Sequence, residues 1–480
     1  MRGPIRARGG LLVVLALFVA LPLLAPPGAR PAAAGSRYLR KVTKVAPGMT
    51  LERITDRRGP NRIRVLRLDP SSKLTLDVAL ATGEIPGHER PSSMAARHGA
   101  IAAINGDFTL RPSQTGAGRP VNIFAEDGEL VTSPLIWGRN FAISHNERNV
   151  FIGHPKFSVY VQQTDSGESL RVRDWNSWPP APGDVGGYTP SGGSAFRPPA
   201  GMCSARLGSV GGRTWGAYEM AVEGRYVVDR VRCGGTRMAR RGGVVLSTPV
   251  GTEQAAIFQE SLSEGETLVL GWSTEWPGVL DTIGGNPTVL EDGQVSIGGC
   301  YSSSFCGRNP RTGIGVTPAG TILLVTVDGR SPGYSVGMTL DGFAALFRYL
   351  GADWALNLDG GGSTAMVVRG RLVNRPSDGW ERAVGSALLI LSGADRGEVP
   401  PDSTPVPSPS PTSIVPPLPD PITSAAAPEA PGGCVSLRDA GSTGGLLDAL
   451  ARGEMGGRRD ALAPELQDAV EVFRGRRACR

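Results

Sequence analysis

The chain has 480 residues and a formal net charge of +6, with 67 glycines, 40 prolines and six cysteines. This length exceeds that of one typical domain and is sufficient to bury a large core. Lysine and arginine form no block outside the extreme termini, so the charge pattern does not indicate a nucleic-acid-binding protein. The glycine and proline content indicates a loop-rich globular protein with a compositionally biased tail.

Residues 1–34 have the organisation of a secretory signal peptide. Arg2, Arg6 and Arg8 precede an apolar run from Leu11 to Leu24, and Ala32 to Ala34 supply small residues for cleavage. The run is short for a membrane span. We therefore expect cleavage directly after these alanines, no stable membrane span afterwards, and a secreted or cell-envelope protein.

The cysteines indicate disulfides, because an even number in an exported chain is typical of a disulfide framework. Proximity in the sequence favours three pairs: Cys203–Cys233, Cys300–Cys306 and Cys434–Cys479. A zinc site is the competing interpretation. Only four histidines are present and no Cys-x-x-Cys occurs, which argues against coordination of a metal by thiolates.

The N-terminal part reads as strands with one short helix. Ile63 to Asp69 and Leu74 to Leu80 alternate around a Pro-Ser-Ser turn and predict a β-hairpin. Ser92 to His98 predicts a helix that leads into an apolar strand from Ala100 to Ile104. This strand ends in Asn105-Gly106-Asp107-Phe108, which places polar groups at its carboxyl end.

The middle of the chain is the least regular part. Asn140 to Ser144 and Leu268 to Trp272 predict strands, and the second is followed by the polar segment from Asp281 to Asn286. Residues 145–250 carry proline and glycine clusters with scattered strand patterns. We interpret them as an elaboration of the same domain.

The clearest unit lies between residues 321 and 358. Thr321 to Val327 predicts a buried strand, and Trp354 to Leu358 predicts a second one. Between them, Thr339 is suited to cap a helix whose apolar residues recur at helical spacing and end before Gly351. The pattern predicts a β–α–β unit, and Ser386 to Leu391 predicts a last core strand.

The segment from Ala355 to Met366 combines polar groups and glycines between apolar runs. Asn357 and Asp359 leave the same face of an extended strand, and Gly360 to Gly362 allow a ligand to approach backbone N–H groups. A hairpin with an Asp-Gly turn between residues 354–358 and 365–369 is the alternative. Both interpretations hold if the turn forms one wall of a cleft.

Two hydrolase patterns and a nucleotide-binding pattern are disfavoured. The segment around Ser331 matches G-x-S-x-G, but all four histidines precede it, whereas the serine hydrolase fold requires its histidine afterwards. The glycine run beginning at Gly360 lacks the lysine of a P-loop, and no His-Glu-x-x-His is present.

Polar pairs recur next to glycines at predicted strand ends. The four pairs are Asn105/Asp107, Asp281/Asn286, Asp328/Arg330 and Asn357/Asp359. Carboxylates and amides suit sugar hydroxyls and acid–base chemistry on acetals, and arginine suits phosphate. One such pair is more typical of a turn, but four at the ends of core strands indicate a site.

These segments resemble, in order, the motifs of the phosphodiester glycosidase family. They are residues 102–108, 284–287, 312–315, 328–330 and 355–364, and residues 376–378 and 382–384 extend the resemblance, which spans about residues 60–393. Many family members have Asn-Gly-Gly-Phe-Phe where this chain has Asn105-Gly106-Asp107-Phe108-Thr109. Asp107 is therefore a departure from the family pattern.

The patterns and the resemblance predict a mixed α/β (α+β) fold with mixed β-sheets covered by helices. We expect one catalytic domain over residues 36–394, with residues 145–250 as its elaboration. Residues 395–433 predict a Pro/Ser/Thr-rich linker. Residues 434–480 predict a small helical tail that would depend on the Cys434–Cys479 disulfide for stability.

The resemblance implies a secreted hydrolase that cleaves the glycosidic C–O bond of a sugar-1-phosphodiester and releases a sugar and a phosphomonoester. Asp359 is the candidate catalytic carboxylate, with Asp328 as its alternative or partner. Arginines are assigned to phosphate and asparagines to sugar hydroxyls. The candidate substrate-binding residues are Asn105, Asp107, Asn286, Arg311, Arg330, Asn357, Gly360, Gly361, Gly362, Ser363, Thr364 and Arg382.

Two other classes of function remain open. One is a non-catalytic protein that binds or matures envelope glycans. The other is a metal-dependent phosphodiesterase, in which clustered Asp and Asn bind Ca²⁺ or Mg²⁺ and the P–O bond breaks. The predicted hydrolysis requires no cofactor, although Ca²⁺ or Mg²⁺ in the glycine-rich turn is compatible with it. The expected partner is a glycan or sugar-phosphate substrate, and not a nucleic acid.

Overall fold

The computed structural model describes residues 37–57, 59–135, 138–145, 149–165, 167, 169–215, 221–298 and 303–393. From Tyr38 onward these residues belong to one compact unit. The predicted signal peptide, linker and tail lie outside the described residues, as do Cys300, Cys434 and Cys479. Across the described ranges, no helix is long and apolar enough to cross a bilayer.

The described residues of this unit form four β-sheets, each named here after one of its strands. The β21 sheet has the strand order β1 (Tyr38–Ala46), β2 (Met49–Asp56), β3 (Asn61–Leu68), β22 (Ile322–Val327), β21 (Arg311–Val316), β23 (Trp354–Asn357), β19 (Thr288–Glu291) and β20 (Gln294–Val295). The β5 sheet has the order β25 (Arg371–Leu372), β24 (Met366–Val368), β5 (Ala102–Asn105), β26 (Ser386–Ser392) and β4 (Leu74–Leu80).

The other two sheets are built mainly from the middle of the chain. The β14 sheet has the order β11 (Ser169–Val172), β10 (Phe157–Gln163), β17 (Thr267–Thr274), β15 (Ala221–Cys233), β14 (Met202–Trp215), β16 (Val244–Pro249), β13 (Gly186–Tyr188) and β12 (Asp174–Trp175). The β18 sheet has the order β7 (Glu129–Thr132), β6 (Phe124–Glu126), β18 (Val279–Gly284), β8 (Asn140–Ser144) and β9 (Val150–Gly153).

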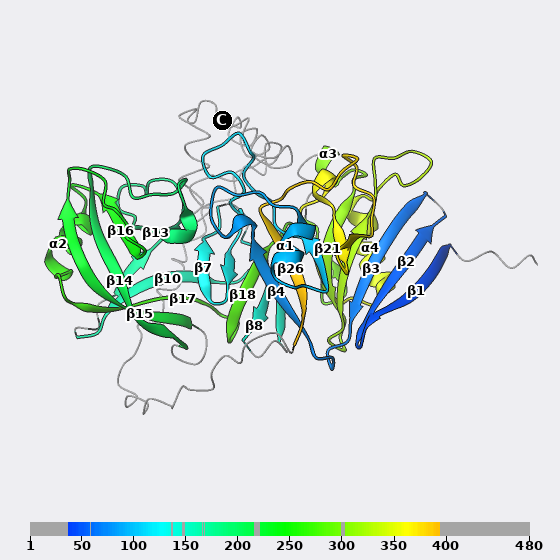
Figure 1. Cartoon of the computed structure of the whole chain (residues 1–480), viewed down its shortest axis with the longest axis horizontal. Coiled ribbons are helices and arrows are strands. Elements are labelled where there is room, and N and C mark those ends of the chain that lie inside the picture. The colour runs from blue at the N-terminus through cyan, green and yellow to red at the C-terminus, as the bar shows by residue number, and fades with distance from the viewer. Residues whose placement is uncertain are drawn as a thin grey trace, which may run out of the picture. The chain divides into compact units, whose positions relative to one another are not determined.

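Helices are few and short among the described residues. They are α1 (Pro91–Arg97), α2 (Glu253–Ser261), α3 (Ser303–Cys306) and α4 (Leu340–Leu350), with the 3₁₀ turns η1 (Ala81–Gly83), η2 (Pro190–Gly192) and η4 (Gly361–Ser363). Strands dominate Figure 1. The predicted combination of sheets and helices is therefore correct in part. Among the described strands, every pair except β12 with β13 is antiparallel, and the expected cover of helices is confined to a few places.

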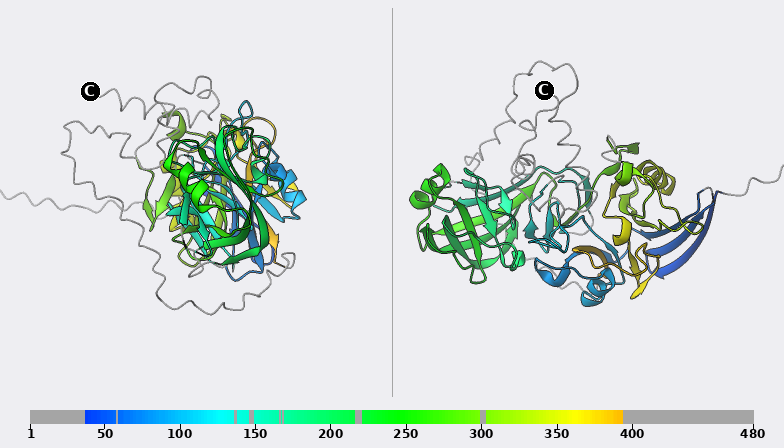
Figure 2. Two further views of the ribbon diagram at one scale, coloured as in Figure 1. Left: turned by 90° about the vertical axis from the view of Figure 1, so that its left-hand side faces the viewer. Right: turned by 90° about the horizontal axis from the view of Figure 1, so that it is seen from above.

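The strands predicted at residues 63–80 exist, but they do not form a hairpin. β3 pairs with β2 on one side and β22 on the other, whereas β4 pairs with β26 in the β5 sheet. Both edges of β3 are thus occupied by other strands, so the chain after Leu68 crosses to a different sheet. Figure 2 shows the resulting association of blue N-terminal strands with yellow C-terminal segments.

The predicted β–α–β unit is confirmed. Thr339 Oγ1 accepts from the Gly342 amide at 3.0 Å, and Gly351 ends α4 in the left-handed conformation with φ 89°. β22 and β23 are not neighbours, because β21 lies between them and is antiparallel to both. Close packing of α4 depends on glycines in β21, since a Cβ on Gly313 would lie 2.8 Å from the Phe343 ring.

The predicted hairpin across the glycine-rich segment is wrong. β23 belongs to the β21 sheet, whereas β24 pairs with β5 and β25 in the β5 sheet. Residues 359–364, here called the glycine loop, therefore carry the chain from one sheet to the other. The polar groups of this loop lie at the junction of two sheets rather than at the tip of one hairpin.

One predicted disulfide is confirmed. Cys203 in β14 and Cys233 in β15 face each other in the antiparallel ladder and are covalently joined. Cys306 is also disulfide-bonded, and its predicted partner Cys300 lies outside the described residues.

The N-cap of α4 provides a test of the fold. Thr339→Ala removes the side-chain acceptor for the Gly342 amide and should lower the free energy of unfolding by about 1 kcal/mol. Thr339→Ser keeps the hydroxyl and serves as the matched control. Equilibrium urea denaturation measures both, and equal stability of Thr339→Ala and the wild type would contradict a stabilising cap.

Candidate active site

The side chain of Asn105 joins the β5 sheet to the β21 sheet where the glycine loop begins. Its Nδ2 donates to the Asp359 carbonyl at 2.7 Å, and its Oδ1 accepts from Thr312 Oγ1 at 2.8 Å and from the Ala365 amide at 3.0 Å. Asn105 is fully buried. Because both ends of its amide bind protein groups, the geometry assigns it to holding the loop, in place of the predicted contact with a sugar hydroxyl.

Two guanidinium groups lie against the glycine loop. A Cβ on Gly361 would lie 3.1 Å from Nη2 of Arg330, and a Cβ on Gly362 would overlap the guanidinium of Arg382. Arg382 also donates to Ser363 Oγ at 3.4 Å. Both arginines are exposed, whereas Gly361, Gly362 and Ser363 are buried. Glycines at these positions thus allow two cations to approach the backbone of the loop closely.

The two arginines are oriented by different partners. Arg330 donates to the amide oxygen of Asn309, with Nη2 at 2.9 Å. Arg382 forms a salt bridge with Asp378, with Nη2 2.7 Å from the carboxylate. Arg330 therefore keeps its full charge beside a neutral partner, while the charge of Arg382 is balanced in part by Asp378.

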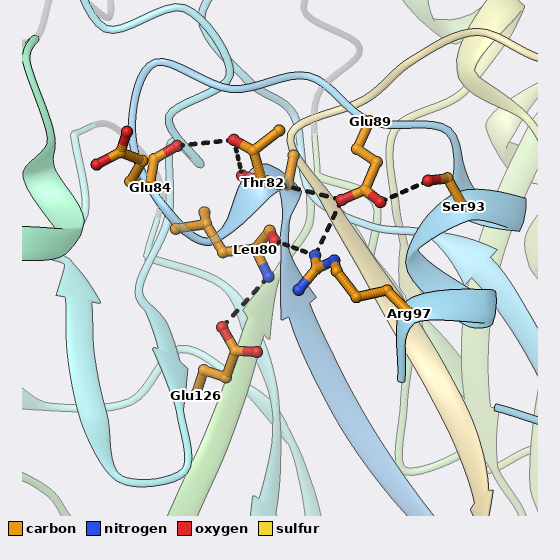
Figure 3. Close-up of polar contacts among 8 residues, drawn as sticks. Leu80, Thr82, Glu84, Glu89, Ser93, Arg97 and Glu126 are labelled. Carbon is orange, nitrogen blue, oxygen red and sulfur yellow. Dashed lines mark hydrogen bonds and ion pairs between the residues drawn. The ribbon is translucent and has the colours of Figure 1, made fainter. Parts of the chain in front are cut away.

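The chain segment that carries Arg382 is anchored to helix α1. The backbone of Val384 exchanges two hydrogen bonds with that of Glu89, and the Glu381 carboxylate accepts from the amide and hydroxyl of Ser92. Glu89 in turn accepts from Arg97, which also donates to the Leu80 carbonyl (Figure 3). These contacts fix the position of the segment relative to the β5 sheet.

The guanidinium of Arg311 has a different environment from those of Arg330 and Arg382. Its guanidinium donates to the carbonyls of Met338, Phe305 and Gly307 at 2.6–3.0 Å, and the residue is 2% exposed. The predicted phosphate contact is therefore replaced by a role in holding the segment before β21. The carbonyl of the preceding Pro310 accepts from the Gly361 amide at 3.0 Å, so this segment also supports the glycine loop.

Asp359 is the carboxylate of the loop itself. Its Oδ1 accepts from the Gly360 amide at 2.9 Å, its own amide donates to the Gly106 carbonyl, and the residue is half-buried. The Gly360 and Gly361 amides are therefore engaged by protein groups, by Asp359 and Pro310 respectively. Ser363 and Thr364 are buried, and Thr364 Oγ1 has no partner among the described residues.

Asp328 is the centre of a separate hydrogen-bond network. Its carboxylate accepts from the Arg375 amide at 3.0 Å, from Asn374 Nδ2 at 3.2 Å and from the Tyr334 hydroxyl at 3.1 Å. Burial raises its pKa above the ordinary value, against the lowering effect of these donors. Asn374 also donates to the Thr364 carbonyl, so Asp328 reaches the glycine loop through one intermediate side chain.

Three buried asparagines form a second polar group beside the loop. Asn357 Nδ2 donates to the Asn286 carbonyl at 2.7 Å, and Asn122 Nδ2 approaches the Gly285 carbonyl at 3.4 Å. Each has an amide atom without a hydrogen-bond partner among the described residues: Asn122 Oδ1, Asn286 Nδ2 and Asn357 Oδ1. These atoms provide two acceptors and one donor for which the described part of the protein supplies no partner.

Asp107 holds Asn122 in this group. Its two carboxylate oxygens accept from the Asn122 amide at 2.9 Å and from Asn122 Nδ2 at 2.8 Å. Complete burial raises the pKa of Asp107 to about 7, although the hydrogen bonds from Asn122 oppose the shift. Asp107 thus binds the backbone amide of Asn122 with one oxygen and its side chain with the other, and it is suited to position Asn122.

The sequence predicted part of this constellation. Asn105, Asp107, Asn286, Asn357, Asp359 and the glycines are brought together at the junction, and Arg330 and Arg382 lie on the loop. Asn122, Asn309, Asn374 and Asp378 were not identified as site residues. Asp378 had a local signal, since it lies four residues before Arg382, whereas Asn122 and Asn309 have none in their flanking sequence.

Asp281 is separated from Asn286 and belongs to a different cluster. Ligand oxygens of Asp77, Asp127 and Asp281 lie within 4.8 Å of one another, and in the described part of the chain this is the acidic group with metal-binding spacing. Its members come from β4, β18 and the turn after β6. At the glycine loop, by contrast, two guanidinium groups favour an anion over Ca²⁺ or Mg²⁺.

Comparison with known proteins agrees with the motifs. Residues 216–391 match the family model described as phosphodiester glycosidase, which confirms the predicted resemblance. The matched range contains Asp328, the glycine loop and both exposed arginines. The uncharacterized SPβ prophage-derived protein YomE of Bacillus subtilis strain 168 is 45% identical over 83 residues, which are 17% of this chain and 13% of that protein. The chain thus covers a small part of this curated relative.

Solved structures share the fold. A hypothetical protein from Synechocystis superposes with a TM-score of 0.56 at 20% identity, covering 73% of this chain and 63% of that one. A protein from Burkholderia pseudomallei K96243, named as a candidate exported protein, superposes with a TM-score of 0.50 at 25% identity, covering 69% of this chain and 74% of that one.

The buried carboxyl of Asp107 predicts a pH dependence. Its pKa is about 7 in the folded protein, compared with an ordinary value of 3.8, so the folded state holds the proton to higher pH than the unfolded state. The stability that Asp107 contributes is therefore present at low pH and is lost as the pH rises from about 4 to about 7.

The matched variant is Asp107→Asn, which cannot ionise. Between pH 4 and pH 8 the wild type should lose up to roughly 4 kcal/mol of unfolding free energy relative to this variant. Urea denaturation at both pH values measures the difference. A difference that does not change, or that favours the wild type at high pH, would show that the two donors of Asn122 outweigh burial.

Proposed function

We propose that the chain is a phosphodiester glycosidase that hydrolyses the glycosidic C–O bond of a sugar-1-phosphodiester. The family match supports an enzyme acting on phosphodiester-linked sugars. The observation that carries the proposal is the arrangement of the glycine loop, where the guanidinium groups of Arg330 and Arg382 lie against the backbone two and three residues after the carboxylate of Asp359. This places anion-binding groups and a candidate catalytic group on one short segment.

The arrangement suits a reaction with a phosphate leaving group. Guanidinium groups are planar donors that match phosphate oxygens, and they stabilise the charge that develops as the C–O bond breaks. Because a phosphomonoester leaves readily, the demand for a strong general acid is small. A carboxylate beside the sugar is then needed to activate water or to stabilise an oxocarbenium-like centre.

Asp359 is the better candidate for that carboxylate. Asp328 already accepts three hydrogen bonds from the protein, and a change in its charge would disturb the network around Asn374. Asp359 is half-buried and sits on the loop that the arginines contact. We therefore assign the chemistry to Asp359 and assign to Asp328 the support of the loop through Asn374.

The asparagine group is assigned to the sugar. Asn286 and Asn357 each keep one amide atom without a partner among the described residues, and Asn105 fixes the loop beside them. Hydroxyl groups both donate and accept, so they complement the two acceptors and one donor of Asn122, Asn286 and Asn357. Ser363 and Arg382 complete the phosphate side of the proposed site.

We further propose that the protein acts outside the cytoplasm, with residues 36–394 as its catalytic domain. The confirmed disulfide between Cys203 and Cys233 is typical of an oxidising compartment. The structural similarity to a candidate exported protein agrees with this location. N-terminal sequencing of secreted material would locate the cleavage that the first 34 residues predict.

Isotope labelling tests the reaction. The purified full chain is incubated with a panel of sugar-1-phosphodiesters in ¹⁸O-labelled water, and the products are analysed by mass spectrometry. Cleavage of the C–O bond places the label in the sugar. Label in the phosphate, together with loss of activity in a chelator, would instead support the metal-dependent phosphodiesterase, and no turnover of any diester would support the non-catalytic glycan-binding alternative.

Asp359→Asn tests the catalytic assignment. Loss of the carboxylate should lower kcat by about 10²–10⁴-fold, in the range attributed to acid–base groups, while the melting temperature changes little. Asp328→Asn is the comparison variant and should lower the melting temperature, because its side chain cannot accept all three hydrogen bonds. Full activity of Asp359→Asn would overturn the assignment.

Arg330→Ala and Arg382→Ala test the phosphate contacts. Each should lower kcat/KM by about 10–100-fold, which corresponds to the loss of one charge-assisted hydrogen bond. Arg371→Ala removes an exposed arginine of β25 and is the matched control, expected to leave kcat/KM unchanged. If both loop variants kept wild-type kinetics with sugar-1-phosphodiesters, the glycine loop would not be the phosphate site.

A further inference from the structure

The β14 sheet carries a cavity of about 440 Å³ that the proposed reaction does not use. Its walls include residues of β10, β12, β14, β15, β16 and β17, so the sheet surrounds it on several sides. Residues Gly128 to Leu130, at the turn into β7, close another side. This volume lies in the range of small-molecule pockets, which occur at the mouths of curved sheets. No residue of the glycine loop is among those that line it.

Aromatic side chains form one part of the wall. Trp175, Tyr226 and Trp272 line the cavity. The indole N–H of Trp175 donates to the Leu130 carbonyl at 2.6 Å, and that of Trp272 donates to the Gly128 carbonyl at 2.9 Å. These bonds fix both rings in place. Fixed aromatic rings provide a rigid apolar surface of the kind on which the C–H face of a pyranose can pack.

Polar side chains form another part of the wall. Thr189 and Glu129 line the cavity and are linked through Ser191, with 2.7 Å between the Thr189 and Ser191 hydroxyls and 3.2 Å from Ser191 to the Glu129 carboxylate. Asn176 Nδ2 donates to the Thr189 hydroxyl at 2.6 Å and so orients the first group in this series of hydrogen bonds. A carboxylate and a hydroxyl held in this way are suited to bind the hydroxyl groups of a ligand.

The charges of the residues that line the cavity favour some classes of ligand over others. Of the described residues that line the cavity, none is lysine or arginine, whereas Glu129 and Glu223 are acidic. An anionic phosphate or fatty acid would meet like charge there. An acyl chain would also bury Glu129 and Thr189 without replacing their hydrogen bonds to water, which is unfavourable. A neutral ligand with both hydroxyl groups and an apolar face satisfies each part of the wall.

We propose that this cavity binds an uncharged saccharide unit of a glycan, at a site separate from the glycine loop. The proposal goes beyond the hydrolytic function and does not depend on it. Glycine at position 224 is part of the fit, because a Cβ there would lie 2.9 Å from the Tyr226 ring and would take up space in the cavity.

The test uses the full chain and saturation-transfer-difference NMR with three neutral trisaccharides: cellotriose, maltotriose and chitotriose. Ser209→Trp places an indole at a position that lines the cavity and should weaken binding of the responding trisaccharide at least about tenfold. Val210→Trp is the matched control, because Val210 is 54% exposed and does not line the cavity. Glu129→Gln is a second variant and should weaken binding while keeping the volume of the side chain.

Circular dichroism and thermal melting establish that the variants are folded. Binding should persist in Asp359→Asn and in Arg330→Ala, which separates this site from the glycine loop. The proposal is overturned if none of the trisaccharides binds saturably, if binding is lost in Arg330→Ala, or if Ser209→Trp and Val210→Trp bind equally well. Saturable binding of octanoate or glucose-1-phosphate that is lost in Ser209→Trp would show that the cavity takes a different class of ligand.

Discussion

The amide of Asn105 is the interaction on which the candidate site depends. It is a buried side chain at the end of β5, and its hydrogen bonds reach Thr312 in β21 and both ends of the glycine loop. The loop crosses between two sheets and has no regular pairing of its own, so its conformation must be fixed by side chains. A buried amide with every polar atom paired supplies that constraint without adding charge to the junction.

Around this junction, charge and neutral polarity are separated. The two cations that lie against the glycine loop, Arg330 and Arg382, are exposed. The asparagines beside the loop, Asn122, Asn286 and Asn357, are buried and uncharged. Asp107 is the ionisable residue in direct contact with this asparagine group, and both of its oxygens accept hydrogen bonds from Asn122. This division matches a substrate that is charged at its phosphate and neutral at its sugar.

Local sequence signals predicted local structure well. The capping threonine, the apolar spacing and Gly351 of α4 all lie within residues 339–351, and the structure confirms each. Both hairpin predictions failed because alternation identifies a strand but not its partner. β3 pairs with the preceding strand β2 and with β22 from a distant part of the chain, and β23 pairs with β19 and β21. None of these pairings is encoded in the turn that follows β3 or β23.

The candidate site shows the same limit. Glycines, Asp359 and Arg330 lie in short motifs with a recognisable composition, so they were found from the sequence. Arg311 lies in a similar context, yet three carbonyls surround its guanidinium. Nothing local distinguishes an arginine that binds carbonyls from one that binds phosphate. Asn122 was missed for the converse reason, since its importance arises from Asp107 and Gly285, which only the folded chain brings to it.

The difference between the partners of the two exposed arginines bears on the chemistry proposed for the loop. Asp378 balances Arg382, whereas Asn309 leaves Arg330 with its full charge, so the three ionised groups sum to one positive charge. A phosphodiester carries one negative charge and is matched by this set. When the glycosidic bond breaks, the departing phosphate gains negative charge, so the attraction between Arg382 and the phosphate increases, whereas the salt bridge of Arg382 to the half-buried Asp378 does not change. A cation whose attraction to the leaving group grows as the bond breaks stabilises the transition state more than the ground state, which is the condition for it to accelerate the reaction.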